Sequence, residues 1–177
     1  MCSPLRFGSS LLFLLTVLSP LVSAPARIRG VEAAIPHSCP VTRGDEHPFI
    51  PPWPYPSKPR PDGFWFGSDR LWIQAPVVWY AASVHGSNGE FILREKMSWH
   101  RQGYDWRSEP EPPLKITGRR LDAEAAPLQA DVGSVVATLP YIMAGIDIPS
   151  TGCWEVTGRY NDDELSFVVW VPALRKS

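Results

Sequence analysis

The sequence has almost no charge imbalance, and this limits what the protein can bind. Its 17 Lys and Arg residues nearly balance its 18 Asp and Glu residues, giving a formal net charge of −1. Because contacts with phosphate backbones and anionic lipid surfaces need an excess of basic residues, we expect no nucleic-acid partner and no polybasic membrane-binding surface. The 177 residues are enough for one domain with a hydrophobic core and too few for two domains that each have a sizeable core.

Catalytic and metal-binding patterns are also missing. The sequence has no Gly-x-Ser-x-Gly motif and no phosphate-cradling glycine loop. Its carboxylates gather in a turn at residues 162–164 and in a loop around Asp105, where solvated turn formers are more usual than acid–base pairs. The four histidines lie apart in the sequence, whereas metal sites need several converging ligands. We therefore expect neither an enzyme nor a bound metal or cofactor.

No apolar run is long enough to span a bilayer. The run Leu11–Leu18 follows the basic Arg6 and precedes the small residues Ala24 and Ala26, which is the layout of a signal peptide. We expect residues 1–26 to be a signal peptide cleaved after Ala26, with retention as an anchor as the alternative. The protein is then extracytoplasmic, either periplasmic or secreted, without a stable membrane span after cleavage.

Cysteine is scarce, and its positions suggest one bond. Of the three cysteines, Cys2 is lost with the signal peptide, which leaves Cys39 and Cys153 in a compartment that permits disulfides. A bridge between them would close a loop of more than a hundred residues, worth roughly 4–5 kcal/mol in the chain-entropy model. The alternative is a pair of buried thiols.

Proline is abundant at the start of the mature chain, where it dominates residues 36–61. Because proline has no amide hydrogen, this segment can be neither a helix nor a central strand. We expect residues 27–61 to form an extended arm, partly in the polyproline II conformation. Phe49, Trp53 and Tyr55 are spaced along it, so it carries aromatic surface that could pack on another part of the chain.

The last ordered stretch, residues 152–171, is typical of a β-hairpin around a polar turn at 161–164. Placing Tyr160 opposite Leu165 puts the apolar residues on one face, as side-chain alternation requires. On that face we expect four core residues, Trp154, Val156, Phe167 and Val169.

The opposite face of this hairpin carries Cys153, Val168 and Trp170, so it is too apolar to remain bare. We expect the aromatic arm, linked through Cys39, to cover it.

Short strand candidates separated by turn residues, roughly seven to nine in all, fill residues 62–172 and leave 173–177 as a tail. No long amphipathic helix interrupts them. The pattern predicts an all-β fold, an immunoglobulin-like antiparallel β-sandwich. The run from Tyr141–Ile148 into Trp154 resembles the corner of such domains, where an aromatic hydrogen-bonds back to the preceding turn. Cys153 points away from Trp154, so the usual disulfide between the sheets is not available.

Several segments together resemble a family of small exported bacterial proteins of unknown function. They are residues 39–42, 71–72, 117–123, 126–128, the Gly152-Cys-Trp-Glu-Val-Thr-Gly158 motif and the Leu165-Ser-Phe-Val-Val169 motif. The resemblance covers most of the mature chain and implies an exported immunoglobulin-like domain with both cysteines bridged. It implies no activity. The aromatic-rich arm and residues 102–106 depart from the family pattern.

The loop after Trp99 is the best sequence candidate for a binding surface, since aromatics stack on rings while Arg and Asp bind hydroxyls and carboxylates. Its candidate residues are Trp99, Arg101, Tyr104, Asp105 and Trp106. Alternatively, Trp99 and Trp106 fold inward and cap the sandwich.

We expect a non-catalytic exported structural or interaction domain whose partner is an unknown protein or glycan. The alternatives are a ligand-binding module, for a glycan in particular, that uses the Trp99–Trp106 loop, and an enzyme of unassigned class. The sequence does not predict an oligomeric state.

Overall fold

The computed structural model describes residues 35–61, 63–76, 78–79, 82–85, 91–133 and 139–173. Both the expected signal peptide, residues 1–26, and residues 174–177 of the expected tail lie outside this range. The described part of the chain forms nine strands: β1 Gly63–Gly67, β2 Leu71–Pro76, β3 Ala82–His85, β4 Phe91–Arg101, β5 Leu114–Arg120, β6 Gln129–Val132, β7 Ile142–Ile148, β8 Gly152–Tyr160 and β9 Asp163–Val171. None of the described residues belongs to a helix that could cross a bilayer.

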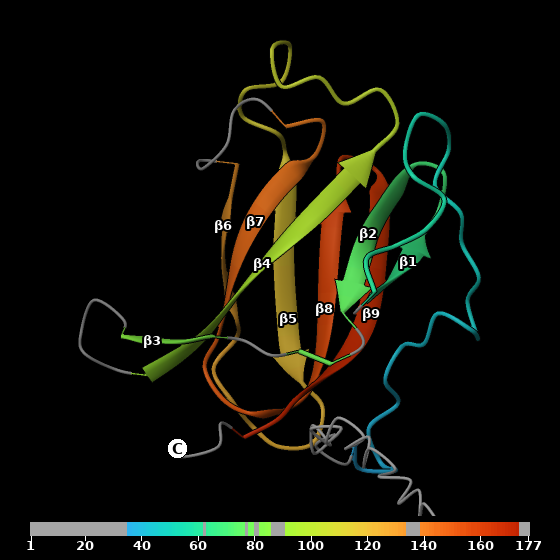
Figure 1. The fold of residues 1–177 in the computed structure, drawn as a ribbon. Helices are drawn as coiled ribbons and strands as arrows, with labels where there is room; N and C mark the ends of the chain where they lie inside the picture. The colour runs from blue at the N-terminus through green and yellow to red at the C-terminus, as the bar shows by residue number, and fades with distance from the viewer. Residues whose placement is uncertain are drawn as a thin grey trace, which may run out of the picture. The chain divides into compact units, whose positions relative to one another are not determined.

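The strands form two antiparallel sheets that face each other (Figure 1). The larger sheet has the order β1-β2-β4-β7-β6, with β3 pairing to the other half of β4, and the smaller has the order β5-β8-β9. The orders β2-β4-β7-β6 and β5-β8-β9 agree with the two sheets of an immunoglobulin constant-type domain. The expected all-β sandwich is confirmed.

The final hairpin has a tighter turn than we predicted. Tyr160 pairs with Asp163, so only Asn161 and Asp162 form the turn, and Asn161 has a left-handed φ of 52°. The predicted pairing of Tyr160 with Leu165 is therefore wrong by two residues. Because side chains alternate with period two, a shift of two residues leaves every side chain on the face that was expected.

The core lies between the two sheets. Trp154, Val156, Phe167 and Val169 are all buried in it. Trp99 of β4 is completely buried and lies against Gly158 of β8, where an added Cβ would come within 2.2 Å of the indole ring. Gly158 therefore makes room for the largest side chain to cross from one sheet to the other.

The turn between β7 and β8 is closed by an aromatic residue, as the sequence predicted. The indole nitrogen Nε1 of Trp154 donates a hydrogen bond to the carbonyl oxygen of Ser150 at 2.9 Å. Trp154 thus takes the role that a tyrosine has at the corresponding corner of immunoglobulin-like domains.

The disulfide between Cys39 and Cys153 is present, with a Cα–Cα distance of 5.6 Å. It attaches the arm to the smaller sheet at β8. Three residues later Thr42 binds β9 twice, since its amide donates to the carbonyl of Val168 at 2.9 Å and its hydroxyl accepts from the amide of Val168 at 2.8 Å. The first residues of the described arm therefore lie on the hairpin, as expected.

The aromatic residues of the arm do not stay over this hairpin, which corrects our expectation that they would cover Val168 and Trp170. The arm continues to the larger sheet, past β1 and β2 (Figure 1). There Phe49 and Tyr55 contact Trp72 of β2, with ring centroids 6.1 and 5.1 Å apart. Trp170 is left half-buried. On the outer face of the larger sheet the rings of the arm pack against Trp72 and His100.

A candidate ligand-binding cleft beneath the arm

The larger sheet has a second set of buried side chains on its outer face. Along β4 the side chains of Met97 and Trp99 enter the core, and those of Ser98 and His100 point the other way. Trp72 is fully buried and His100 is only 5% exposed, yet neither belongs to the core between the sheets. They are covered by the arm instead.

Tyr55 fixes the arm above this face. Its ring meets those of Trp72 and His100 edge-on, at 5.1 and 5.4 Å, and its hydroxyl donates to the carbonyl of Pro140 at 3.1 Å. Partial burial raises the pKa of the Tyr55 phenol, so it remains a hydrogen-bond donor at neutral pH. The arm is thus held at both ends of the segment that crosses the sheet, by the disulfide at Cys39 and by the contacts of Tyr55.

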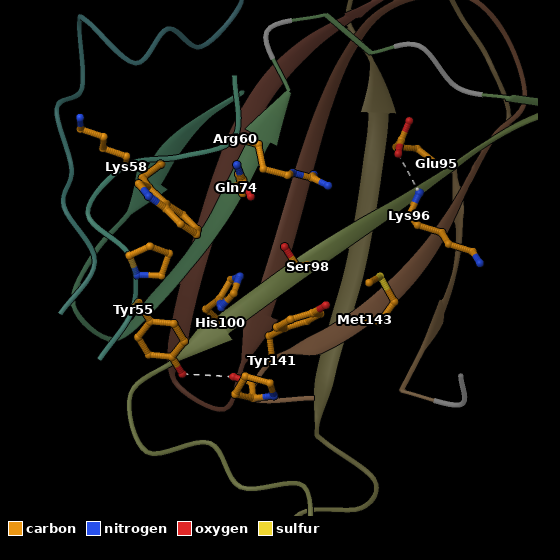
Figure 2. A pocket seen from close by; sticks show the side chains of 13 residues that line it. Tyr55, Lys58, Arg60, Gln74, Glu95, Lys96, Ser98, His100, Tyr141 and Met143 are labelled. Atoms are coloured by element: carbon orange, nitrogen blue, oxygen red, sulfur yellow. Dashed lines mark hydrogen bonds between the residues drawn. The ribbon is translucent and has the colours of Figure 1, made fainter. Parts of the chain in front are cut away.

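Between the arm and the sheet lies a cleft of about 520 Å³. Its sides come from the arm, from β1, β2 and β4, and from the segment that enters β7. Figure 2 shows His100 and Ser98 on its floor, with Tyr55 and Tyr141 beside His100. This volume falls within the range of pockets that hold small molecules.

His100 is the most unusual polar residue of the cleft. Its imidazole stacks on Trp72, with centroids 5.9 Å apart and planes 11° apart, and packs against Trp65, Tyr55 and Tyr141 at 5.2 to 5.5 Å. Burial lowers the pKa of His100 to about 4, so the ring is neutral at pH 7. Neither ring nitrogen has a hydrogen-bond partner in the described part of the protein.

Two other buried polar atoms that line the cleft also lack partners. They are the indole nitrogen of Trp65 and the amide nitrogen of Gln74, both hydrogen-bond donors. Buried polar groups are normally paired, and leaving one unpaired costs about 1–3 kcal/mol. Trp65, Gln74 and His100 all line the cleft, so it is bordered by polar residues whose buried nitrogens the protein leaves unpaired.

Charged residues surround the cleft unevenly. Lys58 and Arg60 from the arm and Lys96 from β4 line it, together with one carboxylate, Glu95. No ion pair joins any of these three cations to a carboxylate among the described residues. In Figure 2 the side chain of Arg60 extends over the floor near Gln74, whereas Lys58 and Lys96 point outward.

The loop that the sequence singled out for binding is largely occupied with its own contacts. Arg101 forms an ion pair with Glu109 and lies over the ring of Tyr160, 5.0 Å from its centroid. The hydroxyl of Tyr160 also donates to Glu109. Trp99 has no exposed surface and cannot contact an external ligand, which agrees with the alternative in which it folds inward.

The remaining loop residues serve local structure or stay at the surface. The carboxylate of Asp105 accepts a hydrogen bond from the amide of Arg107 at 3.1 Å, and Tyr104 packs against the core. Trp106 is half-buried, with the guanidinium of Arg107 4.4 Å from its ring centroid. The structure therefore does not bring the five predicted binding residues together on one open surface.

Sequence reasoning missed the cleft because its residues come from five separate segments. A signal was present: Trp65, Trp72 and His100 make the outer face of the short strands apolar or aromatic as well as the inner face. We noted such a two-sided pattern only for the final hairpin.

The described residues contain no group of three or more His, Cys, Asp or Glu side chains that could hold a metal ion. The arrangement in the cleft is suited to binding, because it offers stacking surfaces, hydrogen-bond donors and cations. No protein-family model matches the chain, and no curated protein or solved structure is significantly similar to it.

Proposed function

We propose that the protein is a non-catalytic exported binding domain whose ligand site is the cleft between the arm and the larger sheet. One observation carries this proposal: His100 is buried on the floor of the cleft with both ring nitrogens unpaired. A fold that needed the histidine only for packing would be more stable with a hydrocarbon ring there, since an unpaired polar group costs free energy.

The cleft also has the general character of a small-molecule site. Its lining combines the rings of Tyr55, Trp65 and Tyr141 with polar side chains, among them Gln74, Ser98 and His100. Among the described residues, Glu95 is the one carboxylate that lines it, so this part of the chain brings no carboxylate pair for acid–base catalysis to the cleft. These features favour binding over reaction.

Export is part of the same proposal. Disulfides persist in oxidising compartments, and the Cys39–Cys153 bond agrees with the periplasmic or secreted location that the expected signal peptide implies. An exported domain of this kind would bind a glycan or another small molecule outside the cytoplasm, or attach to a partner that carries one.

The alternative site, the Trp99–Trp106 loop, is less well supported. Trp106 is half-buried beneath the guanidinium of Arg107, and the exposed Asp105 already forms an ion pair with Arg107 at 3.8 Å. We retain it as the competing outcome of the test.

The test is a titration of the ¹⁵N-labelled protein with defined oligosaccharides and small organic acids, followed by ¹H–¹⁵N correlation spectra. We expect ligands to shift the amide signals of residues 55–60, 96–100 and 141–143. Ser98→Trp should fill the cleft and abolish these shifts. Lys115→Trp, on the exposed face of β5, is the matched control and should leave them unchanged.

Melting curves of both variants must match that of the parent protein for the comparison to hold. If no compound shifts the cleft signals, the proposal is wrong. If binding survives Ser98→Trp and is lost in Trp106→Ala, the loop is the site instead.

A further inference from the structure

We infer that the ligand of the cleft is a carboxylic acid attached to a ring, and this inference rests on the proposed function. The ring would lie against the aromatic walls, and the carboxylate would bind Arg60. Three independent features of the cleft support this class of ligand: its charge, its excess of hydrogen-bond donors, and its flat aromatic walls.

The charge of the cleft differs in sign from that of the whole chain. The sequence carries a formal net charge of −1, whereas the cleft is lined by three cations and one carboxylate. Like charges close together repel, and no ion pair offsets Lys58, Arg60 or Lys96 among the described residues. An anionic group in the cleft would lower this repulsion.

Arg60 is the cation best placed for direct contact. Figure 2 shows its side chain beginning near Gln74 and extending across the cleft toward the side of Glu95 and Lys96, whereas Lys58 points away. The planar guanidinium offers parallel N–H donors that match the two oxygens of a carboxylate. Lys58 and Lys96, which point outward, would contribute through the field around the entrance rather than by contact.

The unpaired polar atoms on the floor also favour an acceptor-rich ligand. Trp65 and Gln74 each present an unpaired N–H donor, and neutral His100 presents one donor and one acceptor. Among the unpaired nitrogens of these three residues, donors therefore outnumber acceptors. A ligand that supplies mainly acceptors, such as carboxylate and hydroxyl oxygens, satisfies this set, whereas a cationic or amine-rich ligand does not.

The walls favour a ring. Tyr55, Tyr141 and His100 lie around the inner part of the cleft (Figure 2). Aromatic faces bind flat apolar surfaces, including the faces of other rings. Two sources share the resulting chemistry: a uronic acid sugar and an aromatic carboxylic acid.

The experiment measures dissociation constants by isothermal titration calorimetry at low salt for two pairs of probes. Trigalacturonate is compared with the neutral galactotriose, and 4-hydroxybenzoate with 4-hydroxybenzyl alcohol. At least one acid should bind roughly tenfold or more tightly than its neutral partner, because charge-assisted hydrogen bonds are the stronger kind. The pair that shows this difference identifies the source.

Arg60→Gln should weaken binding of the acid about tenfold and leave the weak binding of the neutral partner unchanged. Lys115→Gln removes a cation from the exposed face of β5 in the smaller sheet and should change neither value. Arg60 is exposed, so its replacement should not affect folding, and an unchanged melting temperature verifies this. Added salt should weaken binding of the acid selectively.

The outcomes separate the inference from the proposed function. If neutral and acidic probes bind the cleft equally and Arg60→Gln has no effect, the inferred ligand class is wrong while the binding cleft stands. If Arg60→Gln and Lys115→Gln weaken binding of the acid equally, the effect comes from the net charge of the protein and not from a contact with Arg60. The inference is then again wrong. If no probe binds and no compound of the wider titration shifts the cleft signals, both fail.

Discussion

Loss of the Cys39–Cys153 bond should lower the stability of the protein by several kcal/mol without changing its folded structure. The two cysteines are 114 residues apart in the sequence, so the bond restricts nearly the whole described chain in the unfolded state. In the chain-entropy model a loop of this length is worth about 5 kcal/mol at 25 °C. The folded arm would stay in place, because the contacts of Thr42 with Val168 and of Tyr55 with Pro140 remain.

This free energy corresponds to a large change in melting temperature. A domain of this size loses about 3 °C for each kcal/mol, so Cys39→Ala should melt about 15 °C below the parent protein. The assay is thermal unfolding followed by circular dichroism, with urea unfolding to obtain the free energy directly. Reducing agent should lower the melting temperature of the parent protein to that of Cys39→Ala. It should leave the melting temperature of Cys39→Ala unchanged.

The reasoning fails if Cys39→Ala melts within about 3 °C of the oxidised parent protein, which is less than 1 kcal/mol by the same conversion. It also fails if the spectra of the variant show the arm released from residues 72 and 100. In that case the bond would act by holding the arm in the folded state and not by restricting the unfolded chain.

Three further predictions concern single side chains. Gly158→Ala should destabilise the sandwich by about 1–3 kcal/mol in urea unfolding, because the new methyl group would overlap Trp99. Gly145→Ala is the control and should be nearly neutral, since its Cβ would meet no atom closer than 4.0 Å. Equal effects of the two substitutions would contradict this packing. Trp154→Phe should cost about 2 kcal/mol, because it removes the corner hydrogen bond and leaves a small cavity, and an unchanged urea midpoint would argue against the corner. The lowered pKa of His100 means that the unfolded chain takes up a proton at higher pH than the folded chain. The free energy of unfolding should therefore be highest above pH 6.5 and fall by about 3 kcal/mol towards pH 4. This pH dependence should vanish in His100→Phe, and its persistence there would assign it to other groups.

Much of the fold followed from local patterns in the sequence. Alternation along β8 and β9 identified the core face of the hairpin, and it did so although the predicted register was wrong by two residues. Both registers place the same side chains on the same faces, so apolar patterning cannot distinguish them. The conformation of Asn161, which makes the shorter turn, selected between them.

The surface on which the arm packs could not be predicted in the same way. The segment near Cys39 was placed correctly, because the expected loss of Cys2 with a signal peptide left Cys39 and Cys153 as the one possible pair. Where Tyr55 lies depends on which outer face offers the larger aromatic surface. That surface exists only after β1, β2 and β4 have paired and brought Trp65, Trp72 and His100 together.

By itself the sequence determined the all-β class, the disulfide, the corner at Trp154 and the core face of the final hairpin, because each depends on spacing within a short segment or on a single possible pairing. The cleft was decided by the tertiary structure alone. Its groups come from the arm, three strands and the entry to β7, and only strand order brings such distant segments to one face of a sheet. Side-chain alternation specifies two faces for each strand, but it does not specify which strands become neighbours.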